Sequence, residues 1–206
     1  MAGRLRRTWT WLRSPSSGVA AGTLLLVGAI VAGVAWGGFN SFLGYSNTLD
    51  FCTSCHEMKA FVYEEYRERP HFANASGVRA ICSDCHVPKP LIPKLHRKIV
   101  ATFNEVPKHL MGTIDTREKF EARKPVLAQN VWDEMKADDS AACRTCHTSD
   151  ATVLALQKPR ARGQHEDALQ SGETCIDCHK GVAHALPEGY EARATEDMEE
   201  ETDFEL

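Results

Sequence analysis

The longest apolar stretch of the chain lies near its N-terminus. No charged residue occurs between Arg13 and Asp50, and residues 18–39 within that gap are nearly continuously apolar. As a helix, a segment of this length would reach about 33 Å, which is enough to cross the hydrocarbon core of a bilayer. The pattern therefore predicts one transmembrane helix at residues 18–39.

The residues on either side of this segment predict its orientation. Four arginines and no acidic residue precede it: Arg4, Arg6, Arg7 and Arg13. The positive-inside rule then places residues 1–17 in the cytoplasm and the rest of the chain on the other side of the membrane. A cleaved signal peptide would have a shorter apolar region that ends in a small-x-small site. This region ends in Trp36-Gly37-Gly38-Phe39, so we expect an uncleaved anchor.

Beyond the anchor, short helical patterns alternate with prolines. We expect helices at residues 58–69, ended by Pro70, at 93–103, and at 116–136 with a break near Pro125. The alternation of apolar and polar residues that is typical of strands is hard to find. The predicted fold is all-α, with long loops.

One pentapeptide pattern, Cys-x-x-Cys-His, occurs four times and uses all eight cysteines. In this motif both thiols form thioether bonds to a haem, and the histidine is placed to coordinate the iron. Zinc sites and thioredoxin-like redox pairs also use Cys-x-x-Cys, but neither requires a histidine directly after it four times. The pattern predicts four covalently bound haems c, with attachment by Cys52, Cys55, Cys82, Cys85, Cys143, Cys146, Cys175 and Cys178 and with motif histidines His56, His86, His147 and His179.

Composition supports a haem-filled interior. Hydrophobic residues make up 43% of the chain, but many of them belong to the anchor, so the rest would struggle to bury an adequate core. Haems can supply the missing apolar surface. The formal charge of -4 comes largely from residues 195–206, of which seven are acidic, and we expect residues 191–206 to be a disordered acidic tail.

The haem motifs are arranged as a repeat. Cys52 and Cys82 are 30 residues apart, and Cys143 and Cys175 are 32 apart. This spacing suggests a duplicated di-haem unit, with halves at 40–115 and 116–190.

Three isolated histidines stand out as distal iron ligands. His71 precedes the second motif by 11 residues and His165 precedes the fourth by 10, so the two occupy matching positions. His184 follows His179 by only five residues, which is too close to bind the same iron from the opposite side. We therefore expect His184 to serve another haem. His96 and His109 have no counterpart in the repeat and are weaker candidates.

The chain resembles the NapC/NirT family of membrane-anchored tetrahaem cytochromes c up to Pro187. The resemblance is carried by the anchor and by four phrases, Cys55-His56-Glu57-Met58, Ser76 to Ala80 with Asp84 to Pro88, Gly112 to Thr116 with Lys119 to Glu121, and Thr174 to Gly181. It implies a protein of the bacterial inner membrane, with its haem domain in the periplasm. It further implies oxidation of membrane quinol and electron transfer to a periplasmic reductase, nitrate reductase being the expected partner.

The resemblance also suggests ligands that the repeat does not. Related proteins ligate the first haem through a methionine that corresponds to Met58, which leaves the choice between His56 and Met58 open here. A lysine on their second haem corresponds to Lys98, and an acidic residue beside their first haem corresponds to Glu105. Some members have histidine in place of Lys89, so the sixth ligand of haem 2 stays open among Lys98, His96 and Lys89. Met58 and Glu105 are the candidate quinol site.

The sequence is also compatible with other functions. The chain could serve another periplasmic reductase, of nitrite or of an N- or S-oxide, or act as a passive haem relay without a quinol site. A terminal reductase would need an open iron, which three available distal histidines argue against. Gly22, Gly28 and Gly33 suggest a homodimer through the anchor. We expect no nucleic-acid partner.

Overall fold

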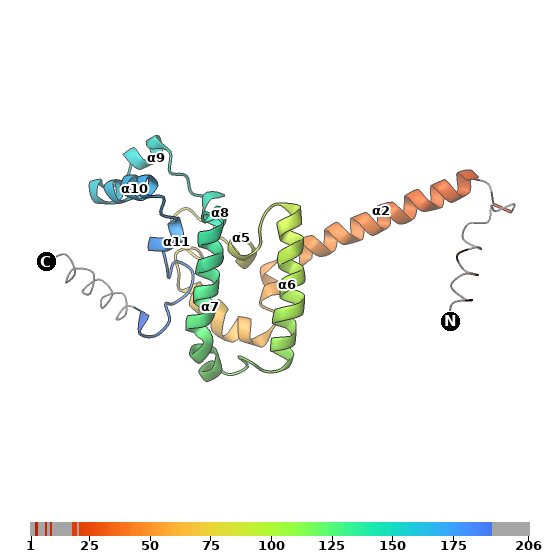
Figure 1. The fold of residues 1–206 in the computed structure, drawn as a ribbon, viewed down its shortest axis with the longest axis horizontal. Coiled ribbons are helices and arrows are strands. Elements are labelled where there is room, and N and C mark those ends of the chain that lie inside the picture. Colours follow the sequence, from red (N-terminus) through yellow and green to blue (C-terminus); the bar gives the residue numbers. More distant parts are fainter. Residues whose placement is uncertain (1–2, 4–6, 8, 10–17, 20, 191–206) are drawn as a thin grey trace. The chain divides into compact units, whose positions relative to one another are not determined.

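The computed structural model describes residues 3, 7, 9, 18–19 and 21–190 (Figure 1). These residues form helices, turns and loops, and none of those described lies in a strand, so the all-α prediction is confirmed. Most of the predicted cytoplasmic segment 1–17 and all of the predicted disordered tail 191–206 lie outside the described residues.

The N-terminal unit contains helix α2, Ala21–Tyr45. This helix extends six residues beyond the predicted end at Phe39, because no charge or proline interrupts the sequence before Tyr45. Its portion Gly22–Tyr45 is long and apolar enough to cross a membrane. The side chains of Leu25 and Val34 are 75% and 70% exposed. Such exposure of apolar side chains is favourable in lipid and unfavourable in water. The Asn40 side-chain amide donates a hydrogen bond to the Trp36 carbonyl (2.8 Å), which satisfies that polar group within the helix.

The second unit begins at Asn47 and carries the four motifs. Its three longer helices are α6, α7 and α10, and the others are only about one turn long. The elements in order are α3 Leu49–Cys52, the π-helix η1 Met58–Val62, α4 Tyr63–Arg67, α5 Cys82–His86, α6 Leu91–Leu110, α7 Arg117–Ala137, α8 Ala141–Arg144, α9 Ala151–Ala155, α10 Pro159–Ser171 and α11 Cys175–Cys178.

The predicted helices are present, but their bounds differ. The helix expected at 58–69 is divided into η1 and α4 and ends at Arg67. Helix α6 extends seven residues beyond the predicted end at Phe103. The predicted break at Pro125 is wrong, since α7 continues through it. Phe120 and Lys124 are buried on that helix, and these tertiary contacts offset the hydrogen bond that proline removes.

The haem domain buries few apolar side chains. Those of Phe61, Tyr66, Phe120, Leu154 and Ile176 are buried in the described part of this unit. Phe61 packs against Phe120, with ring centres 5.6 Å apart. A protein-only core of this size is too small to stabilise a unit of more than a hundred residues, so other apolar groups must complete the interior.

Candidate haem sites

Each Cys-x-x-Cys-His motif coincides with a helical turn. The second motif occupies all of α5, while the fourth occupies α11 with His179 directly after it. The first begins at the last residue of α3, and the third begins inside α8. One turn of helix places the two cysteines on the same side of the backbone, as attachment to one haem requires. All eight thiols are free of disulfide bonds.

A long-range hydrogen bond occurs at a similar place in each predicted half of the domain. In the first, the Ser83 hydroxyl donates to the Asn47 carbonyl (2.7 Å). In the second, the Ile176 backbone N–H donates to the Ser140 hydroxyl (3.2 Å). Both bonds join residues 36 apart, and both connect the start of one motif region to the next motif. These two hydrogen bonds agree with a duplicated unit, although the boundaries 40–115 and 116–190 stay a prediction.

Matching aspartates hold the second motif of each half. Asp84 accepts the Ile81 backbone N–H (2.9 Å), and Asp177 accepts that of Thr174 (2.8 Å). Each carboxylate also pairs with a lysine, Asp84 with Lys89 at 2.6 Å and Asp177 with Lys136 at 2.7 Å. Lys89, a candidate ligand of haem 2, is therefore engaged by a carboxylate beside that motif. The hydrogen bond from Lys136 is the main cause that lowers the pKa of Asp177 to about 2.

Three motif histidines each face one isolated histidine. The ring centres are 6.2 Å apart for His71 and His147, 6.2 Å for His86 and His184, and 5.8 Å for His165 and His179. A metal–nitrogen bond is about 2 Å long, so two imidazoles on opposite sides of one iron have ring centres roughly 6 Å apart. The three separations therefore fit an iron held between two histidines.

Two of these pairs cross between the halves. His71 lies between the first and second motifs, but its ring faces His147 of the third. His184 follows the fourth motif, but its ring faces His86 of the second. Only His165 stays with a motif of its own half. Each half thus supplies a histidine to a motif of the other.

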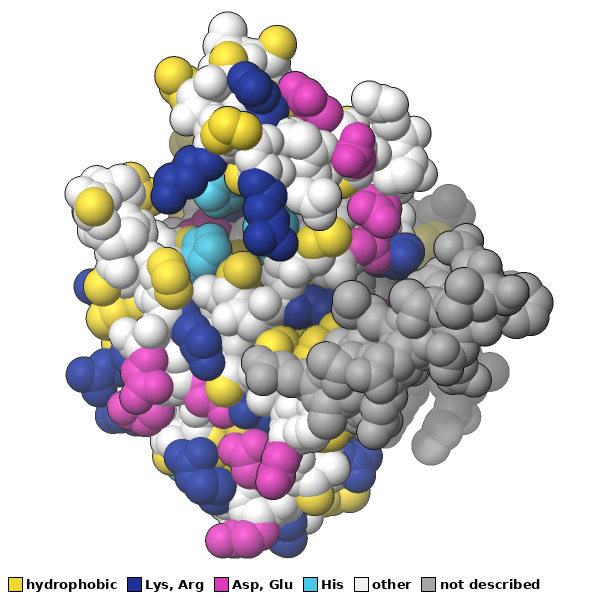
Figure 2. All heavy atoms as spheres, turned by 90° about the vertical axis from the view of Figure 1, so that its left-hand side faces the viewer, with side chains coloured by type: hydrophobic (Ala, Val, Ile, Leu, Met, Phe, Trp, Pro, Cys, Tyr) yellow, Lys and Arg dark blue, Asp and Glu magenta, His cyan; other side chains and the backbone are white. Residues whose placement is uncertain are grey.

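The surroundings of these histidines favour the ligating form of the ring. Nδ1 of His71 lies 3.2 Å from the Val182 carbonyl oxygen, and Nδ1 of His165 lies 2.6 Å from Oε1 of Gln157. An Nδ1–H that donates to such an acceptor leaves the Nε2 lone pair free for a metal. Burial lowers the pKa of His86 to about 4, with His184 and Arg97 adding to the shift, so this imidazole is neutral as a metal requires. Figure 2 shows histidines in a hollow of one face, with lysine and arginine side chains beside them.

A buried ion pair supports the backbone next to His184. The Lys124 ammonium lies 2.5 Å from Oε1 of Glu65, and the two side chains are only 10% and 13% exposed. Oε2 of Glu65 accepts the backbone N–H of Ala185 (3.1 Å). This network connects α4, α7 and the segment that carries His184. Sequence reasoning missed it, because its members lie 59 and 120 residues apart.

The first motif differs from the other three. Nδ1 of His56 lies 3.3 Å from the Glu57 carboxylate, and its Nε2 lies 3.3 Å from the Asp115 carbonyl oxygen. Both ring nitrogens therefore have polar partners already. His109 lies near His56, with ring centres 5.9 Å apart, but the two converge on the carboxylate of Glu57 instead of facing each other across a gap.

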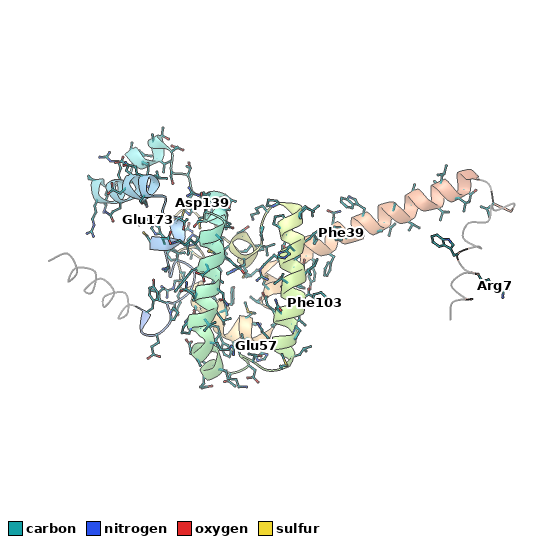
Figure 3. All side chains as sticks on the ribbon, viewed as in Figure 1. Arg7, Phe39, Glu57, Phe103, Asp139 and Glu173 are labelled. Atoms are coloured by element: carbon teal, nitrogen blue, oxygen red, sulfur yellow. The ribbon has the colours of Figure 1, made fainter. Side chains whose placement is uncertain are left out.

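Glu57 is the functional candidate that the sequence did not reveal. Its side chain is 3% exposed and accepts from Nδ1 of His109 at 2.7 Å (Figure 3). Burial raises the pKa of this carboxyl, but the backbone and His109 hydrogen bonds offset burial, and the pKa is lowered overall. The sequence alone gives no sign that Glu57 is buried, because its partner His109 is 52 residues away.

The remaining sequence candidates lie on η1 and α6. Met58 begins the π-helix η1, a conformation that is rare and frequent at functional sites. Lys98 is half-buried on α6. Burial lowers the pKa of Lys98, while Cys52 opposes the shift. Glu105 is 59% exposed and pairs with Arg97 at 2.7 Å. His96 is exposed, with no polar contact in the described part of the chain.

Four attachment helices, three histidine pairs and one apolar helix together define a membrane-anchored multihaem cytochrome of the c type. A model of the NapC/NirT cytochrome c family, N-terminal region, matches residues 14–189. The chain belongs to this family, and its cofactors are covalently bound haems c.

Relatives match most of the chain. The cytochrome c-type protein NapC of Escherichia coli K12 is 48% identical over 186 residues, which cover 90% of this chain and 92% of NapC. The denitrification system component NirT of Stutzerimonas stutzeri is 51% identical over 178 residues, 86% of this chain and 88% of NirT. A putative tetraheme cytochrome c of Allochromatium vinosum is 54% identical over 142 residues, 69% of this chain and 76% of that protein. No solved structure matches the chain.

The motif count makes a direct prediction about mass. The intact holoprotein should exceed the apoprotein by four haem masses, because each motif supplies two thiols for thioether bonds. Mass spectrometry of denatured protein measures this, since covalent haem survives unfolding and bound zinc does not. Protein from cells without the haem-attachment machinery is the control. A gain of two haems, or bound zinc without haem, would contradict the assignment.

Proposed function

We propose that this cytochrome oxidises membrane quinol at its first haem site and passes the electrons to a periplasmic reductase. The observation that carries the proposal is the difference between the first motif and the others. His86, His147 and His179 each face an isolated histidine, whereas His56 is engaged through both ring nitrogens. His109 also lies near His56, with ring centres 5.9 Å apart, but both rings approach the Glu57 carboxylate, which distinguishes the first site from the other three.

The proposed axial ligands follow from the ring pairs. His86 and His184 would hold haem 2, His147 and His71 haem 3, and His179 and His165 haem 4. This assignment gives the sixth position of haem 2 to His184 instead of Lys98, His96 or Lys89. When bound, the haems would accept and pass single electrons, and each of these three histidine pairs would hold one iron.

Met58 is the proposed ligand at the first site. Nε2 of His56 is engaged by the Asp115 carbonyl oxygen and Nδ1 lies 3.3 Å from Glu57, whereas Met58 follows two residues later in the half-buried start of η1. A thioether ligand raises the reduction potential of a haem relative to two histidines, which favours uptake of an electron.

The sequence tethers the first site to the bilayer. Cys52 is seven residues beyond Tyr45, the last residue of α2, and seven residues span at most about 25 Å when fully extended. Quinol stays in the membrane, so a site within this reach suits its oxidation. The arginines ahead of the anchor support a cytoplasmic N-terminus and a periplasmic haem domain.

Quinol oxidation releases two protons, and Glu105 is the proposed acceptor. Its carboxylate is 59% exposed and pairs with Arg97. A proton taken up there would reach the aqueous phase without a buried path.

Periplasmic nitrate reductase is the proposed electron acceptor, because of the similarity to NapC. Similarity to NirT of Stutzerimonas stutzeri and to the cytochrome c-type protein TorC of Escherichia coli K12 keeps other reductases as the alternative. TorC is 43% identical over 185 residues, 89% of this chain but only 47% of TorC. A homodimer through the glycines of α2 is a further proposal.

The quinol site is tested with Met58→His and Glu105→Gln. We expect each variant to reduce its haems with quinol about tenfold or more slowly than the wild type, because one changes the ligand and the other removes the base. Dithionite should still reduce all four haems, since it needs no quinol site. Glu134→Gln, which removes an exposed carboxylate of α7, should behave as wild type. Wild-type rates with quinol in both variants would place quinol oxidation elsewhere.

A further inference from the structure

Helix α6 presents an apolar stripe to its surroundings. Five of its side chains are between 50% and 78% exposed: Ile92, Ile99, Phe103, Val106 and Leu110. Successive residues of a helix are about 100° apart, so these five lie within about 60° of one another. None of the residues of α6 is buried. An apolar stripe of four to five turns that none of the described residues buries is unusual for a water-soluble domain.

The polar side of the same helix faces the haem domain. His109 reaches the buried Glu57, and Lys98 is half-buried. These two residues lie roughly 90–110° around the helix from the centre of the stripe. The polarity of α6 is therefore the reverse of that of an ordinary surface helix, which turns its apolar side to the core.

The stripe lies on a different side of α6 from the contact of this helix with the first motif. His109 hydrogen-bonds Glu57, the residue directly after that motif, so the motif lies on the His109 side of the helix. Phe103, in the middle of the stripe, is 73% exposed and is labelled on α6 in Figure 3. The stripe is therefore about 90° around the helix from the contact with the first motif.

The charge of α6 suits an anionic lipid surface. Between Leu91 and Leu110 the helix has four basic residues, Lys94, Arg97, Lys98 and Lys108, and one acidic residue, Glu105. Four minus one gives a formal charge of +3, in a chain whose formal charge is -4. Amphipathic helices that lie in a membrane interface combine basic residues with Phe, Leu and Ile in this way.

We propose that α6 is a second membrane contact of this protein, which lies in the headgroup region with Ile92, Ile99, Phe103, Val106 and Leu110 turned to the acyl chains. The short tether between Tyr45 and Asn47 keeps the haem domain at the bilayer, so the occupant nearest to an exposed apolar stripe is lipid. The two contacts together would fix the orientation of the domain on the membrane. The proposal does not depend on quinol oxidation.

The test places a photoreactive side chain on each side of α6 in the full-length holoprotein. Phe103→p-benzoylphenylalanine probes the stripe, and Lys108→p-benzoylphenylalanine probes an exposed position about 140° away on the same helix. Each variant is reconstituted in nanodiscs of phosphatidylcholine and phosphatidylglycerol, irradiated and digested. Mass spectrometry then measures phospholipid adducts on peptides that cover residues 91–111.

We expect lipid adducts at position 103 to be at least about fivefold more abundant than at position 108, because only the stripe would reach the acyl chains. An absorption spectrum with all four haems in place confirms that each variant is folded. Equal lipid labelling at the two positions would overturn the proposal. So would a position 103 that cross-links only to a second copy of the chain, or that gives no lipid adduct.

Discussion

Replacing His71 with alanine is expected to convert one low-spin haem, roughly a quarter of the haem in the protein, to a high-spin form. The ring of His71 faces His147 at 6.2 Å and is held by the Val182 carbonyl oxygen. With His71 as the proposed ligand, its removal would leave the iron of haem 3 without a sixth ligand. Electron paramagnetic resonance of the oxidised protein measures the change. His96→Ala, which removes an exposed histidine, should leave the spectrum unaltered.

A second variant identifies which haem is affected. Protein with Cys143→Ala and Cys146→Ala should lack haem 3, the haem that His71 is proposed to ligate because its ring faces His147. Adding His71→Ala to this three-haem protein should create no new high-spin signal. A new signal would mean that His71 ligates a haem of its own half, as its position between Cys55 and Cys82 alone would suggest.

Lys124→Met is expected to lower the melting temperature by roughly 6–12 °C, which corresponds to about 3 kcal/mol for a domain of this size. Its ammonium pairs with Glu65 at 2.5 Å where both side chains are nearly buried, and its removal leaves a carboxylate without compensation. Because Glu65 also accepts the Ala185 N–H, we expect His184 to become loosely held. The variant should therefore contain a fraction of high-spin haem 2, which thermal melts and absorption spectra can both follow.

Two controls isolate the buried pair. Lys119→Met, on the same helix as Lys124, breaks an exposed pair with Asp115 and should leave the melting temperature close to that of the wild type. Lys124→Met combined with Glu65→Gln removes both charges, retains an acceptor for Ala185 and should recover much of the lost stability. A single Lys124→Met variant that melts like the wild type and keeps all haems low-spin would show that the pair does not support His184.

Short, continuous segments of the sequence determine the haem-attachment motifs and the membrane anchor of this protein. A haem-attachment motif is five residues long and a membrane anchor is one continuous apolar segment, so neither depends on distant contacts. His71 and His165 could be identified from their matching positions in the repeat. His184 could be identified because it is only five residues from His179, too close to bind the same iron from the opposite side. The all-α class followed from the absence of strand alternation. The predicted helix bounds were less accurate than the fold class. The break expected at Pro125 is absent because the burial of neighbouring residues outweighs the local effect of proline.

Tertiary structure decided which residues meet. The pairing of His71 with His147 and of His184 with His86 joins residues that are 76 and 98 apart, and no local rule connects such positions. The same applies to Glu57, whose burial depends on His109 from α6. The apolar stripe of α6 could be read from the sequence, but not the side of the helix that the domain would cover. Spacing gives the faces of a helix, whereas packing against the rest of the chain decides which face remains exposed.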